Sequence, residues 1–417
     1  MKNNSSISVH LDEHGNLVLP DVVLKQFGLK PGGKVNAEIS DHGLVIRRST
    51  AALARVYIEP TNACNLDCTT CMRNVWDEPL GTMPMALFTK ILDDLQSFDP
   101  LPNLFFGGFG EPLAHPEIVR MLTTARQAGF EVELITNGTL LDAAAAEQLV
   151  EAGLNRLWVS LDGASPASYA DVRLGAELPR VIENLCQLIA LRDGRKTRLP
   201  KLGIAFVAMQ QNIQDLPAII RLGKSLGVDR FSISGVLPHT KELREQILYR
   251  RSMEDANLLP SEWSPVVSLP RSDPDETLLR ALLEIFAERA SLQVASQPVD
   301  LGVNKCPFVE KGSVSIRWDG AVSPCLSLLH SHTSYLGQNQ RQSHAYTVGN
   351  IQERSLLELW NDPAYVRLRE RLQEFNFSPC AFCNSCQMAE SNLVDCFGND
   401  QPVCGGCLWA QGFIQCP

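Results

Sequence analysis

The sequence predicts an α/β protein built around a partial (β/α)6 TIM-like barrel, with a small β-hairpin module before it and a cysteine-rich, cluster-binding extension after it. Three observations support this fold class. Strand-like and helix-like patterns alternate six times between residues 55 and 238. Apolar and polar residues alternate in short runs over residues 5–48, and nine of the thirteen cysteines lie between residues 306 and 416. Alternating strands and helices form parallel sheets, whose functional groups collect at the carboxyl ends of the strands.

Length and composition suggest several domains. A chain of 417 residues exceeds the usual size of one hydrophobic core. We therefore expect a hairpin module over residues 1–50, the barrel core over 51–240, a connector over 241–300 and the extension over 301–417. The polar start and the lack of an 18-residue apolar run indicate a cytoplasmic protein without membrane segments. Thirteen cysteines in a reducing compartment favour metal or cluster binding over disulfides.

The hairpin module carries its own signature. Its strands break at "EHGN" and "DHG", and the stretch "LDEHGNLVLPDVVLKQFGLKPGGKV" resembles the swapped-hairpin AbrB family of DNA-binding dimers. Residues 1–50 contain six basic and five acidic side chains, and the whole chain has a formal charge of -10. A phosphate-binding face usually needs more positive charge, so we favour a role in homodimerisation or docking over DNA binding.

The barrel strands are expected at six segments, each followed by a turn and most by an amphipathic helix. They are "RVYIEPT", "NLFFGGFGEP", "EVELITNG", "RLWVSLDG", "KLGIAFVAM" and "RFSISGVLP". "HPEIVRMLTTARQAG" and "LPAIIRLGKSLG" are two of the helices. Residues 241–300 combine a Pro/Ser-rich stretch with the helix "TLLRALLEIFAERA", and in the extension one helix is expected from "SLLELW" to "RLRERLQEF".

Three cysteines, Cys64, Cys68 and Cys71, follow the first strand in the spacing C-x3-C-x2-C. A structural zinc site needs four ligands, and no histidine lies between His42 and His115. An iron-sulfur cluster also takes four, so three cysteines would leave one iron open to an outside molecule. The alternative is a zinc site that a remote cysteine completes.

This spacing, after a first strand and before a first helix, resembles the radical S-adenosylmethionine (SAM) superfamily. The resemblance implies a [4Fe-4S] cluster that binds SAM and splits it reductively into methionine and a 5'-deoxyadenosyl radical. It also implies SAM contacts at the ends of the next strands, in "GGFGEP", "TNG", "SLDG" and "YADVRLG". The residues concerned are Gly108, Gly110, Glu111, Asn137, Ser160 and Arg173. The alternatives are an ordinary strand-exit turn for the glycine-rich loop and a surface position for Arg173.

The extension resembles the SPASM domain of radical SAM enzymes, through C-x13-G-x4-C from Cys306 to Cys325 and through "GNIQERSLLELWNDPAYVRLRERL". That resemblance implies two auxiliary [4Fe-4S] clusters. The remaining candidate ligands are Cys380, Cys383, Cys386, Cys396, Cys404, Cys407 and Cys416. Nine thiols exceed by one the eight that two clusters need, and two zinc sites are the alternative. Cys186, at an apolar helical position, is expected in the core.

Longer strings, among them "EPTNACNLDCTTCMRNVWDEPLG" and "CGGCLWAQGFIQCP", are similar to radical SAM maturases associated with tungsten-cofactor oxidoreductases of the aldehyde ferredoxin oxidoreductase type. The similarity implies that the chain matures such an oxidoreductase or its cofactor, with electrons from a reductant such as ferredoxin or flavodoxin.

Two other functions stay open at this point. One is a SPASM maturase that modifies a ribosomally made peptide or a protein side chain. The other is a DNA-binding regulator whose clusters sense redox state. Release of 5'-deoxyadenosine would separate both kinds of enzyme from the regulator. The sequence assigns no general acid or base, and His115 and His239 fit surface positions as well as functional ones.

Overall fold

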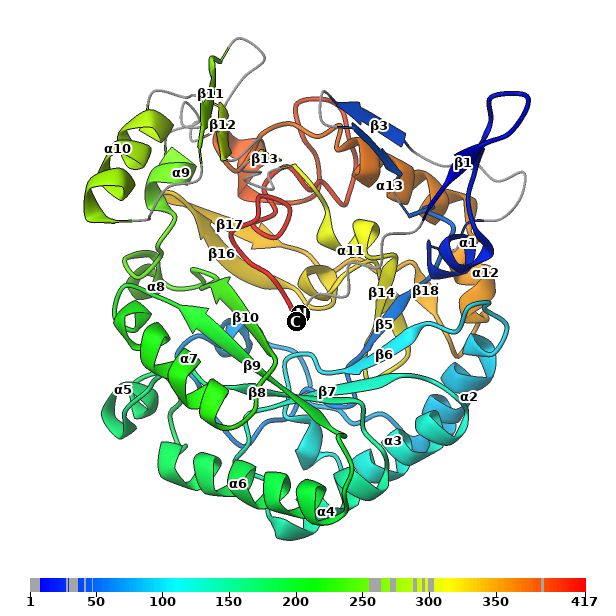
Figure 1. Ribbon diagram of the computed structural model, residues 1–417, viewed down its shortest axis with the longest axis vertical. Coiled ribbons are helices and arrows are strands. Elements are labelled where there is room, and N and C mark those ends of the chain that lie inside the picture. Colours follow the sequence, from blue (N-terminus) through cyan, green and yellow to red (C-terminus); the bar gives the residue numbers. More distant parts are fainter. Residues whose placement is uncertain are drawn as a thin grey trace.

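The computed structural model describes residues 8–27, 29, 37–40, 43–46, 48–254, 264–270, 275–287, 291–294, 297–298, 304–383 and 386–417. Its centre is a curved nine-stranded sheet in the order β10-β9-β8-β7-β6-β5-β14-β15-β18, with helices around its outer face (Figure 1). Strands β5 to β10 are parallel and adjacent in chain order. The predicted α/β class and partial barrel are therefore confirmed.

All six predicted barrel strands are present. They are β5 (Arg55–Ile58), β6 (Asn103–Phe106), β7 (Val132–Thr136), β8 (Arg156–Ser160), β9 (Lys201–Ala208) and β10 (Arg230–Gly235). The helices between and after them are α2 (Met85–Leu95), α3 (Ile118–Gln127), α4 (Ala143–Glu151), α5 (Pro166–Ala170), α6 (Leu178–Gly194), α7 (Leu216–Ser225), α8 (Lys241–Arg244) and α9 (Arg250–Glu254). Short 3-10 turns are η1 (Met72–Val75), η2 (Pro112–Ala114) and η3 (Ile213–Asp215).

Both faces of the barrel sheet are buried, which explains why its strands are almost continuously apolar. Successive side chains of a strand point to opposite faces. Val56 and Ile58 pack outward in the core under the helices, whereas Tyr57 between them packs inward with Phe308 and Trp409 of the C-terminal region. The inner face of the barrel is thus covered by the end of the chain.

The C-terminal region continues the same sheet. Strand β14 (Ser313–Ile316) pairs in parallel with β5, and β15 (Ala321–Ser323) and β18 (Gly349–Asn350) follow in antiparallel order. Its other elements are α11 (Pro307–Glu310), η5 (Leu326–Leu328), the hairpin β16 (His332–Leu336) and β17 (Asn339–Ser343), and η6 (Gln387–Glu390).

The single helix predicted from "SLLELW" to "RLRERLQEF" is wrong. Two helices stand there, α12 (Leu356–Trp360) and α13 (Pro363–Glu374). Asp362 caps the second helix by accepting a hydrogen bond from the Ala364 backbone N–H, and Pro363 occupies its first turn. Proline fits a first turn but cannot continue a preceding helix, so the chain breaks at this point.

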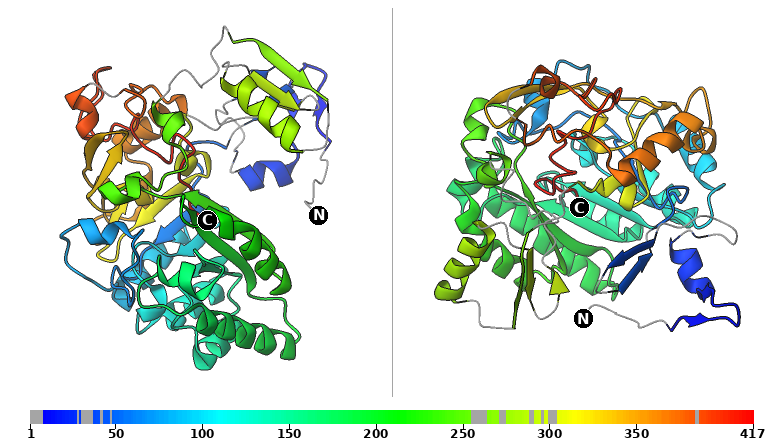
Figure 2. Two further views of the ribbon diagram at one scale, coloured as in Figure 1. Left: turned by 90° about the vertical axis from the view of Figure 1, so that its left-hand side faces the viewer. Right: turned by 90° about the horizontal axis from the view of Figure 1, so that it is seen from above.

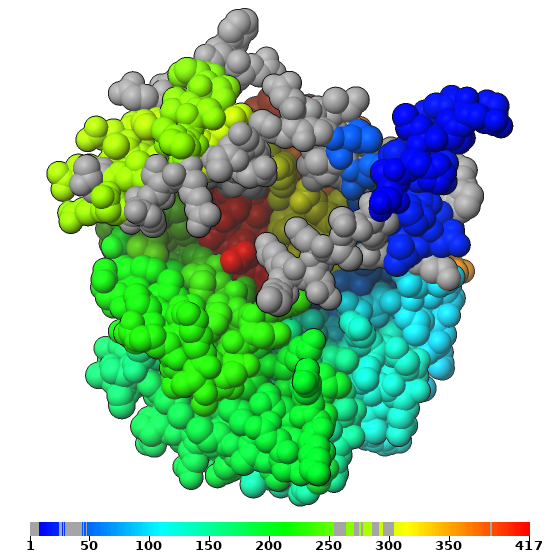
Figure 3. All heavy atoms as spheres, viewed as in Figure 1, coloured from blue at the N-terminus to red at the C-terminus, as the bar shows by residue number. Residues whose placement is uncertain are grey.

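The last residues bridge the open side of the barrel. Phe413 accepts a hydrogen bond from the Gly235 N–H at the end of β10 (3.0 Å), and the Pro417 carbonyl accepts one from Arg55 of β5 (3.1 Å). In the space-filling view, the C-terminal residues surface in red between the green barrel elements and the yellow-green residues above them (Figure 3). The tail therefore connects the two outer strands of the six-stranded part.

Two smaller parts project from one side of the molecule (Figure 2). The first contains the hairpin β1 (His10–Leu11) and β2 (Leu17–Val18), α1 (Asp21–Phe27) and the hairpin β3 (Ala37–Ser40) and β4 (Gly43–Ile46). The second is a three-stranded sheet of β11 (Val266–Leu269), β12 (Ser291–Val294) and β13 (Gln297–Pro298) beside α10 (Glu276–Ala287). The hairpins expected in residues 5–48 are present, whereas the AbrB-type pairing stays a prediction.

None of the helices in the described part of the chain has the length and apolar character that crossing a membrane requires.

Candidate active site

The three-cysteine loop follows β5, and hydrogen bonds tie its first residues to the segment that follows it. Asn62 donates to the Pro79 carbonyl (2.9 Å) and accepts from the Gly81 N–H (2.7 Å), which joins the start of the loop to the segment after it. Within the loop, the Cys71 N–H donates to the Cys68 carbonyl (3.1 Å). The loop is therefore a fixed turn at the carboxyl end of the first strand.

One pocket at this end of the barrel brings together every residue that the sequence predicted for the cluster and SAM. Its cavity volume is about 240 Å³, a little below the roughly 300–1,000 Å³ typical of small-molecule sites. The predicted residues that line it are Cys64, Cys68, Cys71, Gly108, Gly110, Glu111, Asn137, Ser160 and Arg173. Eight of them lie at or after the ends of four consecutive strands and Arg173 follows α5, so the sheet assembles most of the pocket.

The glycines after β6 are required by neighbouring protein atoms. A Cβ on Gly110 would lie 2.1 Å from the Thr61 carbonyl oxygen, and one on Gly108 would lie 2.8 Å from the Glu59 side chain. The glycine-rich loop is thus pressed against the segment that leads into the cysteine loop. The sequence interpretation placed these glycines in contact with SAM and missed this contact between the two loops.

Glu111 connects the ends of β6 and β7. Its buried carboxylate accepts hydrogen bonds from the Leu113 N–H (2.9 Å), the Thr136 hydroxyl (2.8 Å) and the Asn137 N–H (2.7 Å). Burial raises the pKa of Glu111, although these three donors favour its charged form. A carboxylate has about four acceptor positions, so one remains for a ligand in the pocket.

Two side chains point N–H groups at the thiols. The Asn137 amide lies 3.9 Å from the Cys64 sulfur, and Arg173 Nη1 lies 3.9 Å from the Cys68 sulfur. Arg173 also forms a 2.6 Å ion pair with the fully buried Asp162. The alternative of a surface arginine is therefore wrong, because this guanidinium is held inside the barrel by a carboxylate.

The environment of the thiols bears on what they can bind. Burial raises the pKa of Cys68 to about 11 against the opposing charge of Arg173, and burial also raises that of Cys71. A metal ligand must be a thiolate, so the bound group itself has to displace these protons. Within the described ranges, no three His, Cys, Asp or Glu side chains converge on a point that could hold a single metal ion. Three thiols with N–H donors beside them fit an iron-sulfur cluster, whose thiolates each bind a different iron.

Comparison with known proteins decides the family. Residues 58–190 match the model of the radical SAM superfamily, and residues 306–387 match that of SPASM, an iron-sulfur cluster-binding domain. A tungsten-containing aldehyde ferredoxin oxidoreductase cofactor-modifying protein of Pyrococcus furiosus is 31% identical over 87% of this chain and 96% of its own length. This chain belongs to the radical SAM superfamily.

Other relatives agree with this assignment. The PqqA peptide cyclase of Gluconobacter oxydans is 25% identical over 83% of this radical SAM chain and 88% of its own length. The crystal structure of Streptococcus suis SuiB bound to S-adenosylmethionine covers 82% of this chain and 72% of the SuiB chain, with 19% identity and a TM-score of 0.51. That likeness shows the shared fold. As a radical SAM enzyme the protein binds SAM and a [4Fe-4S] cluster, and its C-terminal region is an iron-sulfur domain.

In the SPASM region, four cysteines line a second pocket on the inner side of the barrel. They are Cys306, Cys325, Cys404 and Cys407. Burial raises the pKa of each of these thiols. Leu237 and Trp409 line both this pocket and the radical SAM pocket, so the two pockets share a wall. Four thiols in one pocket, with Cys325 buried and the other three cysteines partly exposed, fit a fully ligated cluster.

The "CGGC" turn is shaped by its surroundings. A Cβ on Gly405 would lie 1.7 Å from the Ser378 carbonyl oxygen, and one on Gly406 would lie 2.9 Å from the guanidinium carbon of Arg341. Arg341 is 2% exposed, and its charge interacts with the thiols of Cys380, Cys404 and Cys407. The turn thus packs directly on a buried cation beside the cysteines.

The remaining SPASM cysteines differ in exposure. Cys380 is buried and interacts electrostatically with Cys396, while Cys383, Cys386 and Cys396 are exposed. Among the described residues Cys416 is not part of the four-thiol pocket. It lies near Lys311 and the Trp409 indole, and burial raises its pKa.

Three expectations about single side chains are corrected. Cys186 is exposed on α6, because it falls one position outside the buried stripe that Leu185 and Leu188 form. His115 is buried, and its Nε2 lies 2.9 Å from the Met83 carbonyl oxygen. His239 is buried as well, with Nδ1 near the Leu237 carbonyl, so a surface position is wrong for both histidines.

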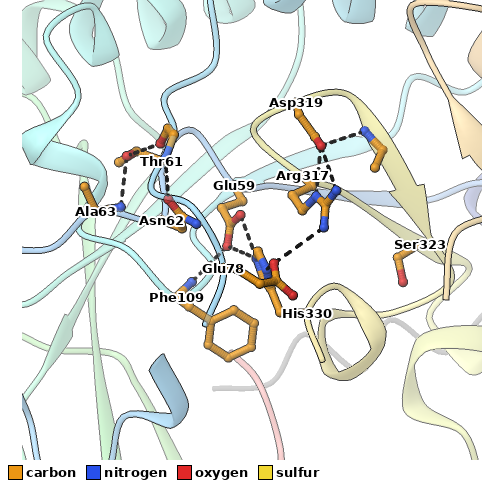
Figure 4. A network of polar contacts seen from close by, with 12 residues as sticks. Glu59, Thr61, Asn62, Ala63, Glu78, Phe109, Arg317, Asp319, Ser323 and His330 are labelled. Carbon is orange, nitrogen blue, oxygen red and sulfur yellow. Dashed lines mark hydrogen bonds and ion pairs between the residues drawn. The ribbon is translucent and has the colours of Figure 1, made fainter. Parts of the chain in front are cut away.

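The sequence interpretation missed a group that consists of the buried Glu59 and His330 and the partly exposed Glu78, here called the His330 clamp (Figure 4). His330 Nε2 lies 2.9 Å and 3.0 Å from the two Glu59 oxygens, and its Nδ1 lies 2.5 Å from Glu78 Oε2. The only sequence signal was a charged Glu59 directly after a buried strand. His330 stands 252 residues after Glu78, so no local pattern could join them.

Proposed function

We propose that this protein is a radical SAM maturase that acts on a tungsten-cofactor oxidoreductase of the aldehyde ferredoxin oxidoreductase type or on the cofactor of such an enzyme. The observation that carries the proposal is the similarity to the Pyrococcus furiosus cofactor-modifying protein, which extends over 96% of that protein. The convergence of nine predicted residues in one pocket supports the chemistry.

In this proposal Cys64, Cys68 and Cys71 hold a [4Fe-4S] cluster and leave one iron for SAM. When bound and reduced, the cluster would pass one electron to SAM, whose carbon-sulfur bond would break to give methionine and a 5'-deoxyadenosyl radical that removes a hydrogen atom from the substrate. Asn137 and Arg173 donate N–H groups toward the thiolates, which favours the charged form of the ligands.

Other residues bind and orient SAM. Glu111 offers its remaining acceptor position to the SAM ammonium, and Gly108, Gly110 and Ser160 line the surface beside it. Leu237 and Trp409 cover the inner end of the pocket and keep water from the radical. A ferredoxin or flavodoxin is the proposed electron donor.

We also propose two auxiliary clusters. Cys306, Cys325, Cys404 and Cys407 would hold the first, and Cys380, Cys383, Cys386 and Cys396 the second. Cys416 is the ninth thiol and stays free in this assignment. Such clusters persist in a reducing compartment, which agrees with the predicted cytoplasmic location.

The decisive experiment is anaerobic reconstitution followed by iron, sulfide and 5'-deoxyadenosine measurements on the wild type and on C64A, C68A and C71A. Each variant should lose roughly one cubane and all SAM cleavage. Zinc at these cysteines, or cleavage that survives their removal, would contradict the chemistry. For the substrate, the reconstituted enzyme should raise the activity of an oxidoreductase produced in its absence.

A second candidate is modification of a ribosomal peptide, favoured by the 25% identity over 88% of a PqqA peptide cyclase. In that case SAM cleavage would persist while the oxidoreductase stayed unaffected, and a peptide would change mass.

We further propose that residues 1–50 mediate homodimerisation. Light scattering of the full chain should then give a dimer, and a chain that lacks these residues should be monomeric.

A further inference from the structure

The His330 clamp joins the SPASM region to the radical SAM core. His330 is fully buried, lies between η5 and β16, and places a carboxylate oxygen at each ring nitrogen (Figure 4). A neutral imidazole has one N–H, so donation to both carboxylates requires the imidazolium. Burial would lower the pKa of His330, but its hydrogen bonds to Glu59 and Glu78 and their charges raise it above 6.5.

The two carboxylates flank the cysteine loop. Glu59 precedes Cys64 by five residues, and Glu78 follows Cys71 by seven. Glu59 also accepts a hydrogen bond from the Phe109 N–H (3.3 Å), next to the position where Gly108 packs on its side chain. One histidine therefore fixes both ends of the cysteine loop and, through Glu59, the glycine-rich loop.

The other side of the clamp leads to the auxiliary site. His330 follows Cys325 by five residues, and the turn between them is closed by hydrogen bonds from Leu328 N–H to the Cys325 carbonyl (3.4 Å) and from Leu329 N–H to the Leu326 carbonyl (3.1 Å). Cys325 lines the four-thiol pocket. A short turn therefore connects that pocket to His330.

Other charged groups face the clamp from the elements around it. Arg317 approaches Glu78 (3.6 Å) and pairs with Asp319 (2.7 Å). His332 is near His330 and His239, and burial lowers its pKa to about 4, so it stays neutral. The Trp76 ring lies against His330, with centroids 4.2 Å apart, and shields the clamp from water. His330 is consequently the histidine of this cluster whose pKa is raised, so it keeps its charge to a higher pH than an ordinary histidine.

We propose that His330 is a positioning residue through which the SPASM region sets the affinity of the radical SAM pocket for SAM. The inference rests on the proposed function, because it requires a cluster at Cys64, Cys68 and Cys71. A charged His330 holds the two loops in the geometry that receives SAM. Loss of that charge leaves the buried Glu59 without its cationic partner and releases the glycine-rich loop.

The test measures the Kd of radiolabelled SAM by anaerobic equilibrium dialysis against pH, on reconstituted protein of known iron content. A histidine with a raised pKa stays charged below that pKa and loses its charge as the pH rises through the pKa. Wild-type affinity should therefore fall with rising pH. H330Q should bind SAM about tenfold more weakly at pH 6.5 and show no such pH step.

Two further variants separate positioning from simple destabilisation. E78Q removes one of the two carboxylates, so the pH step should move to lower pH while iron content stays unchanged. H115Q alters another buried histidine, which pairs with the Met83 carbonyl and accepts from the Glu117 N–H, and should keep the wild-type Kd and pH profile. Binding of H330Q within twofold of wild type, or an unmoved step in E78Q, would overturn the proposal. A reconstituted wild type that holds no iron at Cys64, Cys68 and Cys71 would instead refute the proposed function.

Discussion

At the residue scale, close contacts with neighbouring protein atoms determine which residues can line the pocket. Gly110 is packed against the carbonyl oxygens of Thr61 and Ala63, which belong to the segment before the cysteine loop. Arg173 occupies the barrel interior because Asp162 neutralises it there. In both cases a residue that a ligand was expected to require is first required by a neighbouring part of the protein.

We expect G110A to lose cluster binding at Cys64, Cys68 and Cys71. Its Cβ would lie 2.1 Å from a backbone oxygen, so one of the two loops has to move. Iron content and SAM binding report the loss. G194A is the matched control, since a Cβ there has open space at the end of a helix and should be neutral or slightly stabilising. Full iron content in G110A would contradict this explanation.

Arg173 and Asp162 should behave as one unit in stability measurements. Removal of Arg173 leaves a fully buried carboxylate without its cation, a change that typically costs about 3–5 kcal/mol. R173Q should therefore lower the free energy of unfolding by roughly that amount, and D162N should restore much of it in the double variant. Chemical denaturation of the wild type, R173Q, D162N and the double variant measures this coupling. If the two single changes in unfolding free energy simply add in the double variant, the coupling is excluded.

At the element scale, short turns position the cysteines of the SPASM region. The "CGGC" turn contains two glycines because the Ser378 carbonyl and the Arg341 guanidinium lie against it. Arg341 donates to the carbonyls of Ala389 (2.6 Å) and Val403 (3.4 Å), which fixes its charge beside the thiols. The turn and strand β17 therefore act together on the electrostatics of the auxiliary site.

We expect R341Q to lower the midpoint potential of an auxiliary cluster. Loss of a buried positive charge disfavours the more negative, reduced cluster. A tenfold change in the equilibrium constant of reduction corresponds to about 59 mV for one electron. A redox titration followed by electron paramagnetic resonance measures the shift, and R341K should shift less. The control is R369Q, at a buried arginine that packs on Trp360 and Tyr365. Equal potentials in wild type and R341Q would contradict the prediction.

At the scale of the whole molecule, the C-terminal region continues the barrel sheet and covers its inner face. Strand β14 pairs with β5, while Trp409 and Ile414 join the apolar core on the inner face. Catalytic and auxiliary pockets share Leu237 and Trp409 as a common wall. The two regions therefore cannot separate without exposing this core.

The position of Cys416 in the closing tail gives a prediction at this scale. C416S should retain all iron and sulfide, whereas C407S should lose about one cubane, because only Cys407 lines the four-thiol pocket. Deletion of residues 413–417 should lower the melting temperature by several degrees, since the bonds that tie β10 to β5 disappear. An iron deficit in C416S equal to that of C407S would assign the ninth thiol to a cluster.

The sequence by itself determined the barrel, because six strands buried on both faces must be apolar and helices must alternate with them. Its resemblance to the radical SAM superfamily also predicted which residues line the pocket, since the spacing C-x3-C-x2-C and the strand-end loops that carry the resemblance are local patterns. Only the tertiary structure decided the His330 clamp, the grouping of Cys404 and Cys407 with Cys306 and Cys325, and the place of Cys416. The His330 clamp and the four-thiol group join segments more than 70 positions apart in the chain, and such contacts follow from packing and charge neutralisation in the folded interior.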